Sequence, residues 1–439
     1  MTVTAKERIR FGKSRRELVS RVALAQLHPK ERKFDPIDVL RASTEGRIPQ
    51  LLAVKYARMR VSPFAFFRGA VSIMASDLGR LPNSGLHVQL CGDAHVQNLG
   101  SFATLDGKLV FDLNDFDETI RGPWEWDVKR MATSILLAGQ ECGHDRAGCR
   151  DAAEVFVESY CRSVGWFSEL PILQVARQQI RREKRIQPIQ AALRQSERAR
   201  PLDLLKKFTE LDGHGQRRFR DLRPGFWRIR GAKAKEILGS LRTYRQNLAP
   251  ERRHLFDLFR GVDVGFKVVG TGSVGLRDYV VLFEGNGAQD PMFLQIKQEV
   301  ASAYAKCFPK AIHPHQGRRA ADGQRAIQPI SDLLLGWTTI GSHHYLVRQL
   351  NDHKGRVDLQ RLRGGGLRSL ALVAGELLAR GHARSGDVCE IRGYCGSGVK
   401  MAKVLRDFAS EYADQTEADY GAFVAAIKGG KIRVAKEGG

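Results

Sequence analysis

The sequence predicts an α+β fold of two lobes, in which a small antiparallel β lobe is flanked by the segments of a large helical lobe. Its 439 residues are too many for one ordinary domain and enough for two hydrophobic cores. Short β-rich runs gather in the segment 261–352, and segments with helical spacing lie on both sides of it. We therefore expect a large lobe from 1–260, a β-rich lobe from 261–352, and a helical segment at 353–439 that returns to the large lobe.

The composition is that of a globular chain without membrane segments. Hydrophobic residues make up 43% of the sequence, and no apolar run approaches the roughly 20 residues that cross a bilayer. The seven cysteines are scattered and form no CxxC pair, which predicts free thiols in a reducing compartment and neither a zinc site nor a disulfide framework. Residues 1–21 are charged and lack the core of a signal peptide, so we expect a cytoplasmic location.

The net charge of +23 is concentrated in one segment. Residues 177–235 hold eighteen Lys and Arg against six Asp and Glu. A segment of this kind can bind nucleic acid or another polyanion. We favour solvated helical faces instead, because few aromatic residues interleave with the charges and no nucleic-acid-binding motif is present.

Ahead of residue 261, the spacing of apolar residues is mostly helical. Two short β-rich runs interrupt it, one leading into a Gly92-Asp93 loop and one following an Asp106-Gly107 turn. The predicted helices are 48–59, 64–78, 126–140 and 150–167, the predicted strands are 86–90 and 108–113, and 170–255 is predicted to be mostly helical.

After residue 261 the pattern changes to short strands. The glycine-rich segments 270–275 and 285–287 separate three of them, which favours an antiparallel meander. The predicted elements are strands at 266–269, 279–283 and 292–296, a helix at 322–335, a strand at 344–350 and further helices from 367 onward.

A motif of acidic and amide residues precedes the β-rich lobe. Asp93 and Asn98 lie five positions apart on one predicted loop, and Asp115 follows the strand that ends at Leu113. Phosphoryl transfer requires this spacing, since one carboxylate orients and deprotonates the attacking hydroxyl while an amide oxygen and a second carboxylate hold Mg²⁺. We therefore assign Asp93 as the catalytic base, and Asn98 and Asp115 as metal ligands.

Neighbouring polar residues carry further predictions. Asp117 is another candidate metal ligand, although capping of the local backbone is slightly favoured for it and for Asp112. His95 is a candidate catalytic residue that positions the loop beside the substrate, or else a packed, hydrogen-bonded histidine. Asp127 is expected to cap a helix and to brace the catalytic loop. Internal ion pairs are expected for three polar residues in apolar contexts, Arg68, Asp77 and Arg348.

Two classes of enzyme use the motif Gly270-x-Gly272-x-x-Gly275. In a dinucleotide-binding fold the glycines open a helix, whereas residues 276–283 are strand-like. Strand, glycines and strand form the hairpin with which kinases cover phosphates through backbone N–H groups. A hairpin whose glycines serve only turn geometry is the alternative. The predicted nucleotide-binding residues of this loop are Gly270, Thr271, Gly272, Ser273 and Gly275.

Lys297 ends the strand that follows this hairpin. Kinases place at this position the lysine that binds the α- and β-phosphates, so we predict that role. A strand-end lysine that faces water is the alternative. Its acidic partner stays open among Glu299, Asp322 and Asp332. Gln349 ends the strand expected to lead to an adenine-contacting hinge, and is predicted to bind the nucleotide.

Together these residues resemble two known groups of proteins. Gly92-Asp93-x-His95-x-x-Asn98, followed by Asp115-Phe116, is similar to the catalytic pattern of aminoglycoside and choline phosphotransferases. More closely, the sequence resembles the bacterial domain of unknown function family 2252. That resemblance covers nearly the whole chain and implies no settled activity. Its hallmarks are the segments 62–69, 92–95, 114–119, 267–275 and 345–350, extended by 382–387 and 412–416.

Two departures from the phosphotransferase pattern matter. Cys91 stands where that pattern has a mainly structural histidine, which leaves catalysis feasible. Kinases run from glycine hairpin through lysine to catalytic loop, whereas here the loop precedes the hairpin by about 170 residues. We therefore predict a circularly permuted, protein-kinase-like fold in which a helix at 370–384 leads toward the catalytic loop. One nucleotide can touch both groups only if Lys297 lies within roughly 15 Å of Asp115.

The predicted activity is phosphoryl transfer from ATP, with Mg²⁺, to a hydroxyl group of a small-molecule acceptor. One alternative is transfer of AMP to a protein from a nucleotide bound in the inverted orientation. Another is a non-catalytic pseudokinase whose basic segment 177–235 binds a polyanion. The expected partners are a nucleotide and an unidentified acceptor, whose pocket is expected within 140–255; no membrane is expected, and nucleic acid is not favoured.

Overall fold

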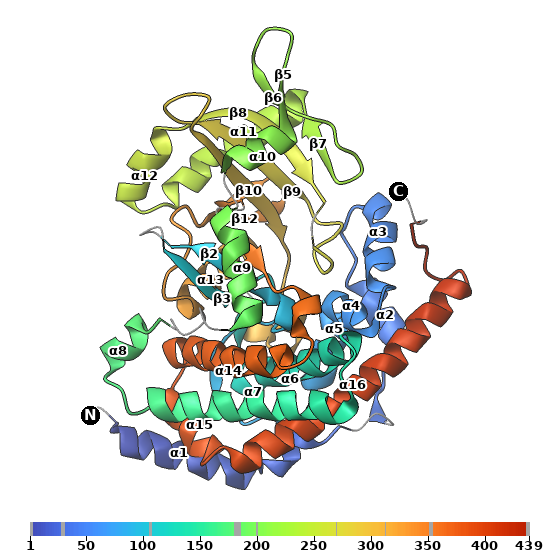
Figure 1. Ribbon diagram of the computed structural model, residues 1–439, viewed down its shortest axis with the longest axis vertical. Coiled ribbons are helices and arrows are strands. Elements are labelled where there is room, and N and C mark those ends of the chain that lie inside the picture. The colour runs from blue at the N-terminus through green and yellow to red at the C-terminus, as the bar shows by residue number, and fades with distance from the viewer. Residues whose placement is uncertain are drawn as a thin grey trace.

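A computed structural model describes residues 3–27, 31–104, 108–179, 186–198, 201–268, 270–311, 313–350 and 354–435. Within these ranges the protein has an α+β fold with helices α1 to α16 and four antiparallel sheets. Figure 1 shows a β-rich lobe at the top and a helical lobe below it. None of the helices in the described ranges is long and apolar enough to cross a membrane.

The β-rich lobe is built on a six-stranded antiparallel sheet with the order β11-β12-β10-β9-β8-β7. The predicted meander and the strand predicted at 344–350 are confirmed. The sequence does not predict β7 or β11, and β7 brings a segment from ahead of residue 261 into this sheet. The strands are β7 Phe226–Ile229, β8 Arg260–Lys267, β9 Asp278–Glu284, β10 Pro291–Glu299, β11 Gly336–Ile340 and β12 His343–Gln349.

Helix α13 spans Gln316–Ile327 and so begins and ends earlier in the chain than predicted. The predicted bounds, 322–335, are therefore wrong. The helix begins at Gln316 because His315 Nδ1 accepts a hydrogen bond from the Arg318 N–H at 3.0 Å. It ends at Ile327 because Gln328 precedes a proline and is extended. The apolar residues that follow belong to the approach to β11.

Helices cover one face of the large sheet, where Ile237, Tyr244 and Phe256 pack against Val281 and Tyr345. The opposite face is partly covered by a helix and a hairpin that form a second, smaller core with the sheet. The covering elements are α11 Gly231–Gln246 and α12 Pro250–Asp257 on the first face, with α10 Pro201–Phe208, β5 Thr209–Leu211 and β6 Arg217–Phe219 on the second. The described part of 170–255 is thus mostly helical, as predicted, apart from its connecting loops and the strands β5, β6 and β7.

The core of the helical lobe is assembled from the first and last thirds of the chain. Trp124 stacks on Tyr160 with ring centroids 5.4 Å apart, and Tyr394 meets its edge at 6.3 Å. In Figure 1 the teal helices α6 and α7 lie beside the orange-red helices α14 and α16. The helices predicted at 126–140 and 150–167 are confirmed. The four helices are α6 Trp124–Glu141, α7 Arg146–Phe167, α14 Gly366–Ser385 and α16 Val399–Lys428.

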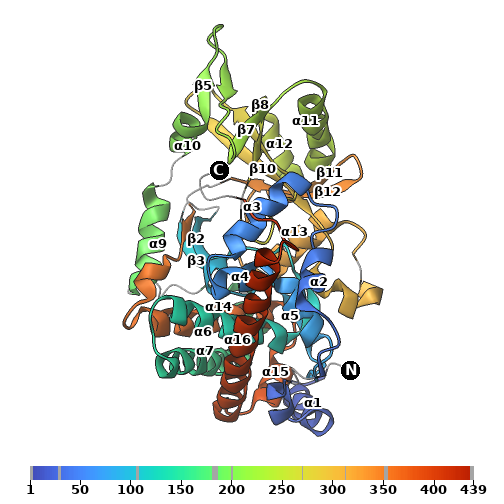
Figure 2. The same cartoon turned by 90° about the vertical axis from the view of Figure 1, so that its right-hand side faces the viewer.

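The N-terminal helices pack around this core. Helix α1 crosses α15 so closely that a Cβ on Gly12 would lie 1.9 Å from the Glu390 carbonyl oxygen. Figure 2 shows α16 passing in front of α4, and α16 also contacts α2. The predicted helix at 48–59 is confirmed as α3. These elements are α1 Ala5–Leu18, α2 Pro36–Ala42, α3 Pro49–Met59, α4 Pro63–Gly69, α5 Val71–Leu78 and α15 Val388–Cys395.

The single helix predicted at 64–78 is wrong, because the chain breaks into α4 and α5 at Ala70. The Ile73 N–H donates to the Ala70 carbonyl oxygen, so the Gly69 carbonyl oxygen has no helical donor in that turn. Lys55 Nζ donates to it instead, at 3.1 Å. A tertiary contact therefore sets the break.

Two small sheets contribute apolar residues to the core of the helical lobe. In one, β2 lies between β3 and β13, and in the other β1 pairs with β4. The strands predicted at 86–90 and 108–113 are confirmed as β1 and β3, whereas the predicted turn at 106–107 lies outside the described residues. The strands are β1 His87–Leu90, β2 Leu99–Ala103, β3 Leu109–Leu113, β4 Ile120–Pro123 and β13 Gly355–Arg356, and the remaining helices are α8 Ile172–Arg177 and α9 Gln187–Arg198.

The C-terminal end of α14 lies directly beside β1. The Gln89 backbone N–H and Ser385 Oγ are 3.3 Å apart, although 296 residues separate them in the sequence. Strand β1 leads into the loop that carries Asp93. The chain thus brings a late helix next to the start of the segment that carries Asp93 and Asn98.

Candidate active site

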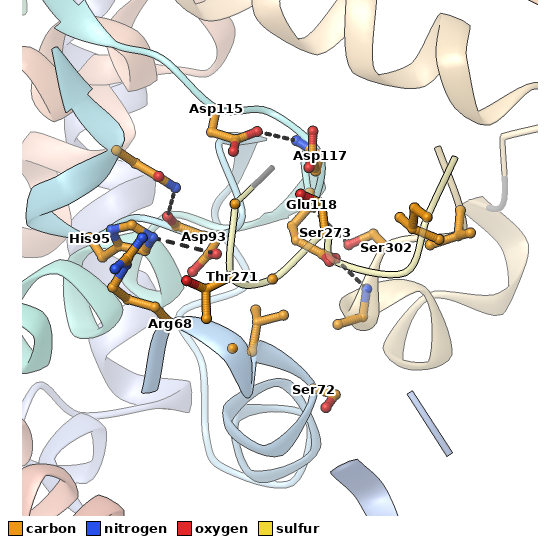
Figure 3. Close-up of a pocket in the computed structure, with 18 of the residues that line it drawn as sticks. Arg68, Ser72, Asp93, His95, Asp115, Asp117, Glu118, Thr271, Ser273 and Ser302 are labelled. Carbon is orange, nitrogen blue, oxygen red and sulfur yellow. Dashed lines mark hydrogen bonds and ion pairs between the residues drawn. The ribbon is translucent and has the colours of Figure 1, made fainter. Parts of the chain in front are cut away.

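A cavity of about 650 Å³ lies between the two lobes (Figure 3). Three distant segments of the chain line it, 93–98, 114–118 and 270–273. Lys297 reaches the same place through its contacts with two carboxylates of the wall. The predicted site residues that line the cavity are Asp93, His95, Asn98, Asp115, Asp117, Gly270, Thr271, Gly272 and Ser273.

Asp93 is a partly desolvated carboxylate with one oxygen already bound. Its Oδ1 accepts a hydrogen bond from Arg130 Nε at 2.6 Å, and the Arg130 side chain is fully buried. Its Oδ2 lies 3.7 Å from His95 Nε2. Burial raises the pKa of Asp93, an effect that the charge of Arg130 opposes. Oδ2 is therefore the oxygen that could take a proton from a bound hydroxyl.

His95 is buried, with its ring edge-on to Phe64 at a centroid distance of 6.4 Å. Burial holds the pKa of His95 well below its usual range, and the charges of Arg68 and Arg130 add to this effect, so the ring is neutral. Its Nδ1 is buried without a hydrogen-bond partner among the described residues. The packing expected of His95 is thus found, but the hydrogen bond expected with it is not, because Nδ1 has no partner in the described ranges and Nε2 lies 3.7 Å from Asp93.

Asp127 braces the loop that carries Asp93. Its carboxylate accepts hydrogen bonds from the backbone N–H groups of Cys91 at 2.7 Å and Gly92 at 3.0 Å, which confirms the predicted bracing role. The predicted helix cap is wrong, because α6 has no side-chain cap. Gly92 has a φ of +89°, and a Cβ there would lie 2.1 Å from a backbone oxygen, so the loop needs glycine. Asn98 Nδ2 closes the loop by donating to the Asp93 carbonyl oxygen at 2.7 Å.

Lys297 joins the two lobes beside the cavity, through contacts with two carboxylates of its wall. Its ammonium group donates a short hydrogen bond to Asp117 Oδ2 and lies 3.7 Å from Asp115 Oδ1. Burial opposes the charge of Lys297, but the two carboxylates outweigh it and raise the pKa of the ammonium group. The distance that allows one nucleotide to touch Lys297 and Asp115 is therefore met.

The acidic partner of Lys297 differs from the three candidates that the sequence offered. Glu299 is buried near Lys297 but lies 3.9 Å from Arg319. Asp322 pairs with Arg318 on the exposed side of α13 at 3.2 Å. The third candidate, Asp332, accepts hydrogen bonds from two backbone N–H groups. All three are thus wrong, because the fold supplies carboxylates from a segment 180 residues away.

The pKa values of the two aspartates beside Lys297 are shifted in opposite directions. Burial opposes ionisation of Asp117, yet the charge of Lys297 lowers the pKa of its carboxyl group. Partial burial and the charge of Asp117 raise the pKa of Asp115, and Lys297 opposes this. The favoured capping role is therefore wrong for Asp117, whose carboxylate binds Lys297. Asp112 Oδ1 does accept from the next backbone N–H at 2.8 Å, but it also accepts a short hydrogen bond from Arg380 in a buried ion pair, so local capping is only part of its role.

Basic side chains of α3 and of the turn that precedes it hold the glycine loop, with Lys55 and Arg47 binding the Gly272 carbonyl oxygen. Lys55 Nζ donates to it at 3.0 Å and Arg47 Nη1 at 2.7 Å. Lys55 is only 1% exposed, and Arg58 donates a short hydrogen bond to the Gly270 carbonyl oxygen. Gly270 and Gly275 have positive φ values of 74° and 93°, which favour glycine. The loop is thus anchored through its carbonyl groups.

Internal ion pairs were expected for Arg68, Asp77 and Arg348, and only that of Asp77 is found. Asp77 pairs with Arg32 at 2.6 Å. Neither of the two arginines forms a salt bridge with a carboxylate in the described ranges. Arg348 Nε donates to the neutral amide of Gln295 at 3.0 Å. Both arginines line the cavity instead.

Gln349 and Gly275 do not line the main cavity. Gln349 lines a neighbouring cavity of about 190 Å³, which shares Asn114, Arg348 and Lys354 with the main one. The Gln349 backbone N–H donates to Asp332 Oδ2 at 2.5 Å. The predicted hinge position is thus adjacent to the site and not within its main wall.

Magnesium fits the oxygen donors of the site. In nucleotide sites Mg²⁺ is held by one or two carboxylates, while substrate phosphates and water complete its shell. Asp115 and Asp117 supply two carboxylates, and Asp117 Oδ1 is buried without a hydrogen-bond partner in the described ranges. Asn98 uses its amide nitrogen within the loop, which leaves its oxygen for a cation. No group of three His, Cys, Asp or Glu side chains in those ranges could hold a metal, so the ion would depend on the nucleotide.

Sequence reasoning missed several residues of the site. Arg130 and Lys55 lie on predicted helices, and their charge within apolar spacing was the only available signal. Lys354 and Arg356 follow the last strand of the sheet and carry no motif. Glu118 belongs to the conspicuous 114–119 segment, and its carboxylate accepts from the Ala303 backbone N–H at 2.6 Å. Arg130, Lys55 and Glu118 bind partners that are distant in the sequence, which no local pattern could predict.

Comparison with known proteins identifies the family. A search of curated proteins and a search of solved structures each found no match to this sequence. The profile of a family described as "Uncharacterized protein conserved in bacteria (DUF2252)" matches residues 47–426. This span contains every predicted site residue, and it confirms the family resemblance found in the sequence. The chain therefore belongs to the bacterial domain family DUF2252.

Proposed function

We propose that the protein is an ATP- and Mg²⁺-dependent phosphotransferase with a protein-kinase-like, circularly permuted fold, which phosphorylates a hydroxyl group of a small molecule. One observation carries the proposal. Lys297 Nζ lies 3.7 Å from Asp115 Oδ1, beside a cavity that also contains Asp93, Asn98 and the glycine loop 270–273. Kinases gather these groups around one nucleotide.

Each group has a role in this proposal. The backbone of 270–273 covers the phosphates, and Lys297 binds the α- and β-phosphates. Asn98, Asp115 and Asp117 hold Mg²⁺. Bound Mg²⁺ would neutralise the charge that develops on the phosphate oxygens.

Asp93 acts on the acceptor. Its Oδ2 takes the proton of the acceptor hydroxyl while the hydroxyl oxygen forms a bond to the γ-phosphorus. The bond between the γ-phosphorus and the β,γ-bridging oxygen breaks, and ADP leaves with that electron pair. Arg130 fixes Oδ1 through its 2.6 Å hydrogen bond, which keeps the other oxygen directed to the reaction.

Circular permutation accounts for the order of the elements. In an unpermuted chain α14 would run directly into β1 and the loop of Asp93. The 3.3 Å contact between Ser385 Oγ and the Gln89 N–H supports this arrangement. So does the glycine loop between β8 and β9, followed by Lys297 on β10.

Replacement of Asp115 and of Asp93 tests the proposal. Asp115→Asn should reduce MgATP turnover by about 100-fold or more, because the metal loses a charged ligand. Asp93→Asn should reduce transfer by about 100-fold or more while Mg–nucleotide affinity changes by less than about threefold, because the base does not touch the nucleotide. ADP release measures turnover, and mass spectrometry of the product identifies the group transferred.

Asp322→Asn is the matched control, since this carboxylate is 45% exposed on α13 and outside the cavity. Turnover that persists in Asp115→Asn would contradict the proposal. A product that gains AMP would replace it with nucleotidyl transfer. A wild-type protein that binds no nucleotide would favour a binding module.

A further inference from the structure

We propose that the acceptor is an anionic molecule, and that a phosphate-type oxyanion on it binds a cluster of four cations in the cavity wall. The inference rests on the proposed function, since it names the acceptor class of the same site. The cation cluster consists of Arg68 on α4, Arg348 on β12, Lys354, and Arg356 on β13, and all four residues line the 650 Å³ cavity.

Carboxylates near the cation cluster act on it only at a distance, as Asp93 does on Arg68 and Asp332 on Lys354. None of its four side chains forms a salt bridge in the part of the chain that the structure describes. Arg348 is held by neutral groups, with Nε donating to Gln295 Oε1 at 3.0 Å and Nη1 3.5 Å from the Asn114 carbonyl oxygen. Arg68 Nε is buried and lacks a hydrogen-bond partner among the same residues. A buried donor and adjacent unpaired cations call for an anionic ligand.

Mutual repulsion within the cation cluster also favours binding of an anion. Burial and the charge of Arg348 lower the pKa of Lys354 to about 7, and Asp332 only partly offsets them. Burial lowers the pKa of Arg68, where Arg356 adds to the effect and Asp93 opposes it. A bound oxyanion would relieve this repulsion, and guanidinium groups match its geometry with two parallel hydrogen bonds.

The carboxylates of the cavity are engaged by groups outside the cation cluster, so they do not supply the missing charge. Glu118 accepts from a backbone N–H. The other pairs are Asp93 with Arg130, Asp115 and Asp117 with Lys297, and Glu299 with Arg319.

The position of Arg68 assigns the oxyanion to the acceptor. Figure 3 shows Arg68 beside His95 and Asp93, on the opposite side of the cavity from Asp117. Asp93 is the residue that contacts the acceptor hydroxyl in the proposed reaction, so an anion on Arg68 belongs to the molecule that Asp93 touches. The nucleotide already has Lys297 and the metal for its phosphates. Aminoglycosides and choline are cations, so this acceptor differs in charge from those of the enzymes that share the motif.

Binding of inorganic phosphate to the full-length protein tests the inference. Isothermal titration calorimetry should detect saturable phosphate binding by the wild type. The double variant Lys354→Gln/Arg356→Gln and the single variant Arg68→Gln should each weaken it by about tenfold or more. Arg361→Gln is the matched control, because Arg361 lies five residues after Arg356, is 54% exposed and is outside the cavity. Thermal melts verify that each variant is folded.

A saturating complex of Mg²⁺ with a non-hydrolysable ATP analogue separates the acceptor from the nucleotide. Phosphate affinity should change by less than about threefold when the analogue is bound. Displacement of phosphate by the analogue would assign the cation cluster to the nucleotide's own phosphates and overturn the inference. Absence of saturable phosphate binding, or equal binding by wild type and both variants, would overturn it as well.

The Asp115→Asn variant distinguishes failure of this inference from failure of the proposed function. It should lose MgATP turnover and keep phosphate binding. If turnover depends on Asp115 but phosphate does not bind, only the anionic acceptor is rejected. If phosphate binds as expected but turnover is indifferent to Asp115, the phosphotransferase is rejected and the anion site remains.

Discussion

Asp278 is a buried carboxylate on β9 whose ionisation the fold resists. It is 4% exposed, its Oδ2 accepts a hydrogen bond from Gln295 Nε2 at 2.7 Å, and its Oδ1 has no partner in the described ranges. Burial raises the pKa of Asp278 to about 6, although the charges of Lys267 and Lys297 oppose the shift. The folded protein therefore binds this proton more tightly than the unfolded chain does.

A pH-dependent gain in stability should follow from Asp278→Asn. Because the pKa of Asp278 is raised in the folded state, its contribution to the free energy of unfolding falls as pH rises from about 4 to about 6 and then stays low. The variant should be more stable than wild type at pH 7.5, by about 1–3 kcal/mol, and equal to it near pH 4. Urea denaturation across this pH range measures the difference.

The stability of Asp278→Asn relative to wild type at neutral pH tests this prediction. If Asp278→Asn is less stable than wild type at pH 7.5, the carboxylate serves mainly as a counter-charge for Lys267 and Lys297. The exposed Asp322→Asn substitution on α13 should show no comparable dependence on pH and controls for a general charge effect.

At the scale of residues, spacing in the sequence predicted those whose neighbours are local. Asp93 and Asn98 share one loop, so a five-residue interval was enough to propose their roles, and Asn98 does bond to the Asp93 carbonyl oxygen. The partner of Lys297 could not be predicted in this way, because Asp117 lies 180 residues away. The role of Arg130 could not be predicted either. The helical pattern around it predicts that the side chain is buried, but not that it binds the carboxylate of Asp93.

At the scale of elements, the glycine loop depends on a helix that no motif connects to it. Lys55 on α3 donates to the carbonyl oxygens of Gly69 at 3.1 Å, Thr271 at 3.3 Å and Gly272 at 3.0 Å. A loop that covers phosphates must present its N–H groups inward, and binding of its carbonyl groups from behind favours that orientation. Lys55 thus holds the loop through its carbonyl groups and leaves the N–H groups free for the proposed nucleotide.

Replacing this lysine should release the loop. Lys55→Met keeps the length of the side chain but leaves the Gly69 and Thr271 carbonyl oxygens without this donor, at a cost of about 1–3 kcal/mol each if unsatisfied, while the Gly272 carbonyl oxygen keeps its hydrogen bond from Arg47. Hydrogen exchange at residues 270–275 should become about tenfold faster or more, and Mg–nucleotide affinity should fall. Hydrogen–deuterium exchange with mass spectrometry measures the first effect and calorimetry the second.

Arg58→Gln provides the comparison, because Arg58 binds the Gly270 carbonyl oxygen from an exposed position where water can replace it. Its effect on exchange should be smaller than that of Lys55→Met. Unchanged exchange in Lys55→Met would show that the loop is ordered by its own turn geometry.

The same helix explains why one element boundary could not be predicted. The apolar spacing of 64–78 continues through Ala70, so the sequence favours one helix, whereas Lys55 captures the Gly69 carbonyl oxygen at the break. For α13 the opposite holds, because Gln328 before a proline was visible in the sequence and marks the observed end of the helix. Local signals fix some boundaries, and tertiary contacts fix the others.

At the scale of the whole molecule, the α+β class followed from the distribution of β-rich and helical segments along the chain. The set of helices that forms each core could not be predicted in this way. Apolar spacing indicates which face of a helix is buried, but not which other helix that face contacts. The core of the helical lobe unites Trp124 and Tyr160 with Tyr394, and contacts between α7 and α14 extend it. The small lobe lies in the chain between these two halves of one core.

This arrangement predicts that two fragments of the chain should reassemble. A cut between Gly213 and His214 falls in the exposed turn of the β5–β6 hairpin and breaks no helix. Fragments 1–213 and 214–439, when co-expressed, should copurify, because α6 and α7 on one bury their apolar faces against α14 and α16 on the other. Each buried large apolar side chain contributes about 1.5–3 kcal/mol to such an interface.

Activity then reports on the site as well as on the core. Asp93 and Asp115 lie on the first fragment and Lys297 on the second, so MgATP turnover requires both, and neither fragment should show it alone. A second cut, between Val157 and Glu158 in the middle of α7, should prevent assembly because it divides a helix of the core. If the 1–213 fragment alone were folded and active, the cavity between the lobes would not be the catalytic site, since Lys297 and the glycine loop would be missing from the active species.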